Sequence, residues 1–69
     1  MSEVIFMPEA FRCWYDETRR GARPVQCCTF LAKAGEYGVE HPDLLLRSLV
    51  AAERVTRDPD DHRILTIVS

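Results

Sequence analysis

Hydrophobic residues recur at helical spacing in separate segments of the chain. In the first segment, residues 8–20, one helical face collects Phe11, Trp14, Tyr15 and Thr18. Pro8 can begin this helix, because the first turn of a helix leaves its backbone N–H groups unbonded anyway. Gly21 follows the last residue of the pattern and commonly ends a helix. The pattern therefore predicts a helix over residues 8–20.

Two further segments show the same spacing, and each also opens on a proline. Residues 24–34 predict a second helix, with one face formed by Val25, Cys28, Leu31 and Ala32. Residues 42–52 predict a third helix, with one side formed by Leu45, Ser48, Leu49 and Ala52 and widened by Leu44, Leu46 and Val50. So wide an apolar surface predicts burial from more than one direction, which a contact between two copies of the chain would provide.

The two ends of the chain have the pattern of strands. Residues 3–7 form a short apolar run, and residues 64–68 are apolar and rich in β-branched side chains, so we expect them to pair with each other. Before the second run, Asp58-Pro59-Asp60-Asp61 predicts a tight turn, because proline presets φ and aspartate side chains bond nearby backbone groups. The sequence thus predicts a single α+β domain over 1–69, mostly helical, with three short helices and a C-terminal β-hairpin.

The hairpin resembles the wing of winged-helix regulators of the MarR type. That wing has an Asp-Pro-x-Asp-x-Arg turn followed by an apolar strand, and the matching positions here are Asp58, Pro59, Asp61 and Arg63. The resemblance implies a winged-helix-like fold in which Arg63 faces DNA. It also implies that Asp58 and Asp61 shape the turn and that Asp61 positions Arg63. A narrow minor groove attracts arginine through its negative potential.

A weaker helix-turn-helix pattern lies upstream of this hairpin. Gly38 suits the tight turn between two closely packed helices, which would make residues 42–52 the helix that reads DNA. This helix carries Arg47 as its only basic residue, and Asp43 near its start would repel phosphates. With Arg57 in the strand before the turn, the DNA-binding candidates are Arg47, Arg57 and Arg63.

Net charge and aromatic content favour a different activity. The chain carries 9 basic and 11 acidic residues, a formal net charge of −2, whereas nucleic-acid binders usually show a basic excess. The first predicted helix also combines the residue types that dominate protein interfaces. The candidate protein-binding residues are Phe11, Arg12, Trp14, Tyr15, Arg19 and Arg20.

These observations give two functional hypotheses. The first is a small protein-interaction module, such as a phage- or plasmid-type inhibitor, antirepressor or adaptor that binds and modulates another protein. The alternative is a dimeric winged-helix DNA-binding transcriptional regulator. A length of 69 residues makes a domain only marginally stable alone, so we expect a homodimer or a complex in either case.

The sequence offers no pattern typical of an enzyme, a metal site or a cofactor site. Its cysteines, Cys13, Cys27 and Cys28, form no Cys-x-x-Cys pair, and His41 and His62 fit no zinc spacing. We expect reduced thiols that pack as small hydrophobic side chains. No run is long enough to span a membrane and the N-terminus does not resemble a signal peptide, so the expected location is the cytoplasm.

Overall fold

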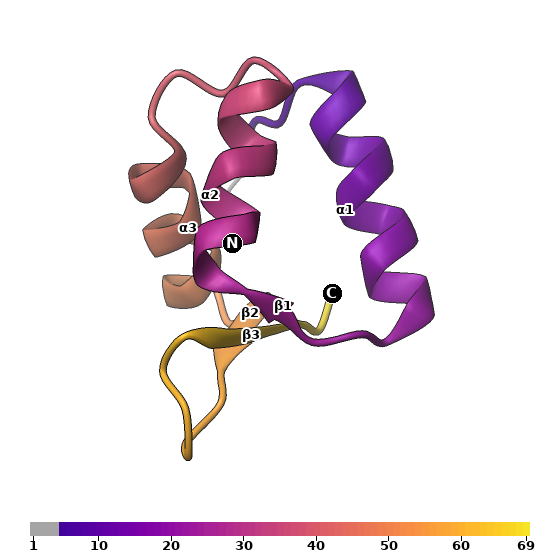
Figure 1. Cartoon of the computed structure of the whole chain (residues 1–69). Helices are drawn as coiled ribbons and strands as arrows, with labels where there is room; N and C mark the ends of the chain where they lie inside the picture. The colour runs from indigo at the N-terminus through magenta and orange to yellow at the C-terminus, as the bar shows by residue number, and fades with distance from the viewer. Residues whose placement is uncertain (1–4) are drawn as a thin grey trace.

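Helices form one layer of the molecule and a small sheet lies against their ends (Figure 1). The computed structural model describes residues 5–69, in the order α1 (Glu9–Gly21), β1 (Val25–Gln26), α2 (Cys27–Glu36), α3 (Pro42–Ala51), β2 (Val55–Arg57) and β3 (Ile64–Ile67). The predicted α+β class, mostly helical with a C-terminal hairpin, is confirmed. Figure 1 shows the loop between β2 and β3 projecting away from the helices.

The sheet is antiparallel with the strand order β1-β3-β2. Val25 pairs with Leu65 on one side of β3, and Thr56 pairs with Thr66 on the other side. The predicted pairing of residues 3–7 with residues 64–68 is therefore wrong, because β1 and β2 occupy both edges of β3. Residues 5–7 are not a strand, and residues 3 and 4 lie outside the described part of the chain.

The start of the second helix also differs from the prediction. Residues 25–26 form β1, and α2 begins at Cys27. The Cys27 N–H donates to the Arg63 carbonyl at 2.6 Å, which ties the beginning of α2 to the start of β3. Pro24 precedes the strand, and its fixed φ suits extended backbone as well as the first turn of a helix.

The core lies between the helices and the inner face of the sheet. Phe11 from α1 and Phe30 from α2 are both fully buried, and their rings meet edge to face with centroids 5.5 Å apart. From α3, the core receives Leu45, Leu46 and Leu49. These three leucines account for much of the wide apolar surface of α3 within one chain. Ser48 and Ala52, which the helical pattern placed on the inner side, are exposed instead.

Candidate functional site

The loop over residues 58–63 is held by its own aspartates. The Asp60 N–H donates to Asp58 Oδ1 at 2.8 Å, the local bond expected of aspartate in a turn. The Asp58 N–H donates to the Ile64 carbonyl at 2.9 Å, and the Ile64 N–H donates to the Asp61 carbonyl at 3.0 Å. These bonds close the hairpin where β2 and β3 end and give its loop a defined shape.

The Asp61 carboxylate holds the Arg63 side chain. Its carboxylate accepts from Arg63 Nε at 3.1 Å and from Nη2 at 3.3 Å, while the Arg63 side chain remains 86% exposed. The hydrogen bonds from Arg63 lower the pKa of Asp61, and the same pairing raises the pKa of Arg63. Arg63 is thus a permanently charged guanidinium that is fixed on one side and open to solvent on the other.

The second arginine of the hairpin, Arg57, also reaches along the loop. Its Nη1 donates to the His62 carbonyl at 3.1 Å, so the guanidinium lies beside the loop backbone. Arg57 and Arg47 line one hollow of about 400 Å³ together with Leu46, Val50 and Asp43. The hairpin and α3 therefore each contribute an arginine to the same depression.

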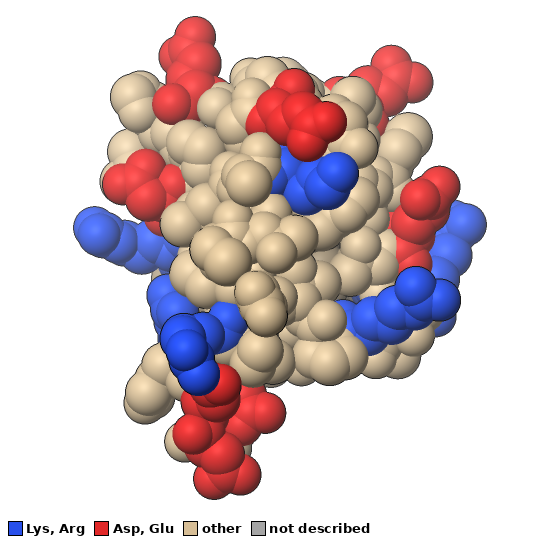
Figure 2. All heavy atoms as spheres, viewed as in Figure 1, with Lys and Arg blue, Asp and Glu red and all other residues tan. Residues whose placement is uncertain are grey.

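A second hollow adjoins the first and brings in Arg63. It has a volume of about 490 Å³, and it shares Cys27 and Leu31 with the first hollow. Figure 2 shows one group of basic side chains next to the acidic end of the β2–β3 loop, and other basic side chains on the opposite side and near the top of the view. The predicted DNA-binding arginines Arg47, Arg57 and Arg63 therefore lie around two neighbouring hollows. We call this surface the arginine face.

The outer side of α3 borders the arginine face. Its exposed residues are Asp43, Leu44, Arg47, Ser48 and Ala51. Leu44 is 49% exposed although Leu45 and Leu46 beside it are buried. The helical pattern alone did not single out Leu44, because it treated every leucine of this helix as part of one apolar surface. Ser48 is polar, and a helix oriented with Ser48 toward solvent also has Leu44 on its outer side, as the structure shows.

The predicted protein-binding cluster on α1 does not form one surface. Phe11 and Tyr15 are 0% and 1% exposed, because they pack into the core, and the Tyr15 hydroxyl donates to the Ser69 main-chain oxygen at 2.9 Å. Burial raises the pKa of Tyr15. Trp14 is half-buried against Phe11 and Phe30. The remaining members, Arg12, Arg19 and Arg20, are exposed on α1.

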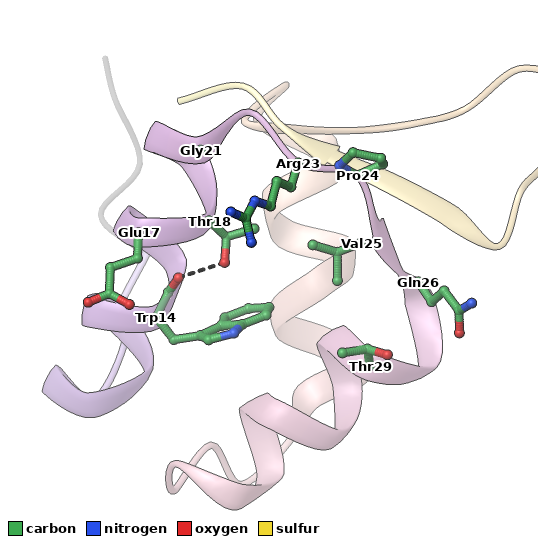
Figure 3. Close-up of a pocket in the computed structure, with 9 residues that line it drawn as sticks. All are labelled: Trp14, Glu17, Thr18, Gly21, Arg23, Pro24, Val25, Gln26 and Thr29. Carbon is green, nitrogen blue, oxygen red and sulfur yellow. Dashed lines mark hydrogen bonds between the residues drawn. The ribbon is translucent and has the colours of Figure 1, made fainter.

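A groove of about 650 Å³ runs between α1 and the β1–α2 segment (Figure 3). Figure 3 shows the side chains of Arg23 and Val25 pointing into this groove toward the Trp14 indole. On its α1 side, the Thr18 hydroxyl donates to the Trp14 carbonyl at 2.8 Å. The groove thus combines one aromatic side chain with charged groups, Arg23 and Glu17, that are exposed to solvent.

The cysteines do not pack as the small buried side chains that we predicted. Cys13 and Cys28 are exposed, Cys27 is half-buried, and all three are free thiols. Within residues 5–69, no group of three or more His, Cys, Asp or Glu side chains could hold a metal ion. None of the helices described here has the length and apolar character needed to cross a bilayer.

Comparison with known proteins leaves function to be inferred from the chain's own residues. No protein-family model matches the chain, and no curated protein or solved structure matches it.

Proposed function

We propose that this chain binds duplex DNA with the arginine face and acts as a transcription regulator. The observation that carries the proposal is the convergence of Arg47, Arg57 and Arg63 from α3, β2 and the hairpin loop around two adjoining hollows. Arginine guanidinium groups match the geometry of phosphates, and phosphate contacts fix the position of a protein on DNA. Two carboxylates, those of Asp43 and Asp61, also line the hollows, so three guanidinium groups leave the surface with a small basic excess that suits a polyanion.

The arrangement of elements supports a specific way of docking. A helix can enter the major groove of DNA, which is about 12 Å wide. Both α2 and α3 border the arginine face, and of these two α3 is the helix that contributes an arginine, Arg47, to it. With α3 in the major groove, the β2–β3 hairpin would lie along the neighbouring backbone, where Arg57 and Arg63 meet phosphates or the minor groove. This is the arrangement that the resemblance to the MarR-type wing implies.

The acidic net charge does not rule out this function, because charge acts locally. Binding to DNA depends on the potential of the surface that meets the phosphates, and it is strongly screened by salt. At the loop tip, Asp58 Oδ1 accepts from the Asp60 backbone N–H, so this bond holds the Asp58 carboxylate in the turn while the Asp60 side chain remains exposed. The net charge of −2 predicts weak non-specific binding and a correspondingly larger share of affinity from specific contacts.

A direct test is selection of bound duplexes from a random DNA pool, followed by affinity measurements on the enriched duplex over about 50 to 200 mM salt. Replacing Arg63 with Ala should weaken binding and reduce the slope of affinity against salt by about one. Arg12→Ala is the matched control, since Arg12 is an exposed arginine on α1 and should leave affinity unchanged. Failure to enrich any duplex would refute the proposal.

A second candidate function is protein binding at the groove beside Trp14. The half-buried Trp14 indole with Arg23 and Glu17 nearby is the observation in its favour, since Trp and Arg are common anchors of interfaces. It ranks second because Phe11 and Tyr15, two of its original anchors, are in the core. Affinity capture from nuclease-treated lysate tests it: one protein recovered by the native chain and lost with Trp14→Ala would support this function.

Homodimerisation stays a prediction. Burial of Leu45, Leu46 and Leu49 within one chain accounts for most of the apolar surface that first suggested a dimer, and Leu44 remains exposed. A regulator that reads a two-fold symmetric site would still bind as two copies. Sedimentation of the free protein and of its complex with the selected duplex would give the number of copies in each state.

A further inference from the structure

One exposed hydrophobic side chain lies on α3, beside the arginine face that we propose to contact DNA. The large hydrophobic side chains exposed in the described part of the chain are Phe6, Leu44 and Val68. Of these, Leu44 belongs to α3, where it is 49% exposed while its neighbour Leu45 is 7% exposed. Leu44 is therefore an apolar group that the core does not use, on the helix beside the arginine face.

The position of Leu44 within α3 matters as much as its exposure. α3 begins at Pro42, so Leu44 lies in its first turn, and a helix in the major groove contacts base edges with its N-terminal residues. Arg47 and Ser48 follow Leu44 by three and four residues, which places them next to it on the same side of the helix. All three side chains are exposed.

The chemistry of base edges then restricts what Leu44 could contact. A leucine side chain forms no hydrogen bond, so neither a phosphate nor a polar base edge gives it a favourable partner. The C5 methyl group of thymine is the apolar group that the major groove presents, and apolar side chains discriminate thymine through it. Arginine, by contrast, pairs with the O6 and N7 acceptors of guanine.

We propose that Leu44 reads a thymine methyl group in the major groove, with Arg47 reading a guanine beside it. This inference rests on the proposed DNA binding and adds to it a residue that determines sequence specificity. A protein partner is the less favoured occupant of this surface. The exposed residues around Leu44 on α3 are Asp43, Arg47 and Ser48, so no continuous apolar patch surrounds it on the helix.

Replacing thymine with uracil tests the inference, because uracil keeps the base pair and removes only the methyl group. In the duplex selected from the random pool, each thymine is replaced in turn. The native protein should lose about three- to fivefold in affinity at one thymine, the effect expected for one apolar methyl group leaving a contact. Leu44→Ala should bind the thymine duplex as weakly as the native protein binds the uracil duplex, and it should show no further loss with uracil.

Two controls separate this contact from a general effect on folding. Alanine is the best helix former and Leu44 is exposed, so Leu44→Ala should keep the native circular dichroism spectrum. Val68→Ala removes a comparable exposed side chain, 55% exposed and outside α3, and should retain the full dependence on the methyl group.

The possible outcomes distinguish the two proposals. If duplexes are enriched but no uracil replacement weakens binding, or if Leu44→Ala keeps the methyl dependence, the reading of thymine by Leu44 is overturned while DNA binding stands. If no duplex is enriched, both proposals fail. A loss that is confined to one thymine and abolished by Leu44→Ala supports both.

Discussion

Asp61 accepts three hydrogen bonds from Arg63, at 3.0 Å from the backbone N–H, 3.1 Å from Nε and 3.3 Å from Nη2. The carboxylate thus holds both the backbone and the side chain of the same residue. Because the Arg63 side chain is 86% exposed, these bonds fix the orientation of a surface guanidinium and are not part of the core. Because Asp61 already restricts the rotamers of Arg63 in the free protein, a ligand that binds Arg63 costs less side-chain conformational entropy.

Asp61→Ala therefore has opposite expected effects on two kinds of DNA. Removing a negative charge strengthens non-specific attraction to phosphates. Removing the orientation of Arg63 weakens binding to the selected duplex, where the guanidinium must meet one position. We expect affinity for the selected duplex to fall several-fold and affinity for an unrelated duplex to rise slightly, measured by fluorescence anisotropy. A parallel rise on both duplexes would mean that Asp61 acts only through its charge.

The pairing of Asp61 with Arg63 also predicts how stability responds to acid. The pKa of Asp61 in the folded protein lies below its ordinary value of 3.8, because the Arg63 hydrogen bonds favour the charged carboxylate. The stabilisation is therefore fully present above that ordinary pKa and is lost as the pH falls through the lower, folded value. Urea unfolding should show native protein more stable than Asp61→Asn at neutral pH, with the difference closing below the ordinary pKa. A difference that persists in strong acid would contradict the assignment.

The hairpin was predictable from sequence because its determinants are local. Asp58, Pro59 and Asp61 act on backbone groups within a few residues, so their spacing carries the geometry of the turn. The partner of β3 was not predictable in the same way. Val25 and Gln26 form a two-residue strand only because they pair with Leu65 and Ile64, which are far away in sequence. An apolar pattern of two residues fits the start of a helix equally well.

The site shows the same division between local and distant determinants. The hairpin pattern in the sequence predicted Arg57 and Arg63 as DNA-binding candidates, and the helical pattern predicted Arg47. Only the fold shows that the three arginines surround two adjoining hollows. The aromatic residues of α1 show the converse. Residue type alone suggested an interface for Phe11 and Tyr15, and the packing of α2 and β3 against α1 puts them in the core. Aromatic side chains occur both in protein cores and at protein interfaces, so residue type alone does not distinguish the two locations.

Tyr15→Phe should destabilise the fold modestly. The substitution keeps the buried ring and removes the hydroxyl that donates to Ser69, and a typical internal hydrogen bond contributes about 1 kcal/mol to the free energy of unfolding. Arg54 Nε still donates to the same Ser69 oxygen at 3.2 Å, so that acceptor keeps a partner. Urea unfolding gives the difference, and Tyr37→Phe is a matched control on a half-buried tyrosine.

Tyr15 also predicts a loss of stability in alkali. Burial raises its pKa in the folded protein above the ordinary value of 10.0, so the folded state holds the phenol proton more tightly than the unfolded state does. The resulting stabilisation is complete below pH 10.0 and disappears as the pH rises through the folded value. Native protein should therefore lose stability in this range faster than Tyr15→Phe, which has no phenol to ionise. Equal losses for the two proteins would place the titrating group elsewhere.

Glu53→Gly should stabilise the chain. Glu53 connects α3 to β2 with φ at 61°, a left-handed conformation in which a side chain is strained, and its side chain is exposed. Glycine adopts this conformation without the Cβ penalty, although it also gives the unfolded chain more freedom. The left-handed conformation costs a residue with a Cβ about 1–2 kcal/mol, so we expect a net gain of roughly 0.5–1 kcal/mol in the free energy of unfolding.

Gly38→Ala is the reciprocal test of the same backbone argument. Gly38 has φ at 95° and nothing within 4 Å of an added Cβ, so alanine there meets no steric contact and reports the backbone strain alone. We expect Gly38→Ala to lower the free energy of unfolding by at least about 1 kcal/mol, while Glu53→Gly raises it. Both variants keep the arginine face intact, so their affinity for the selected duplex should match that of the native chain. Stabilisation by both substitutions, or by neither, would show that backbone conformation does not set the stability of these two connections.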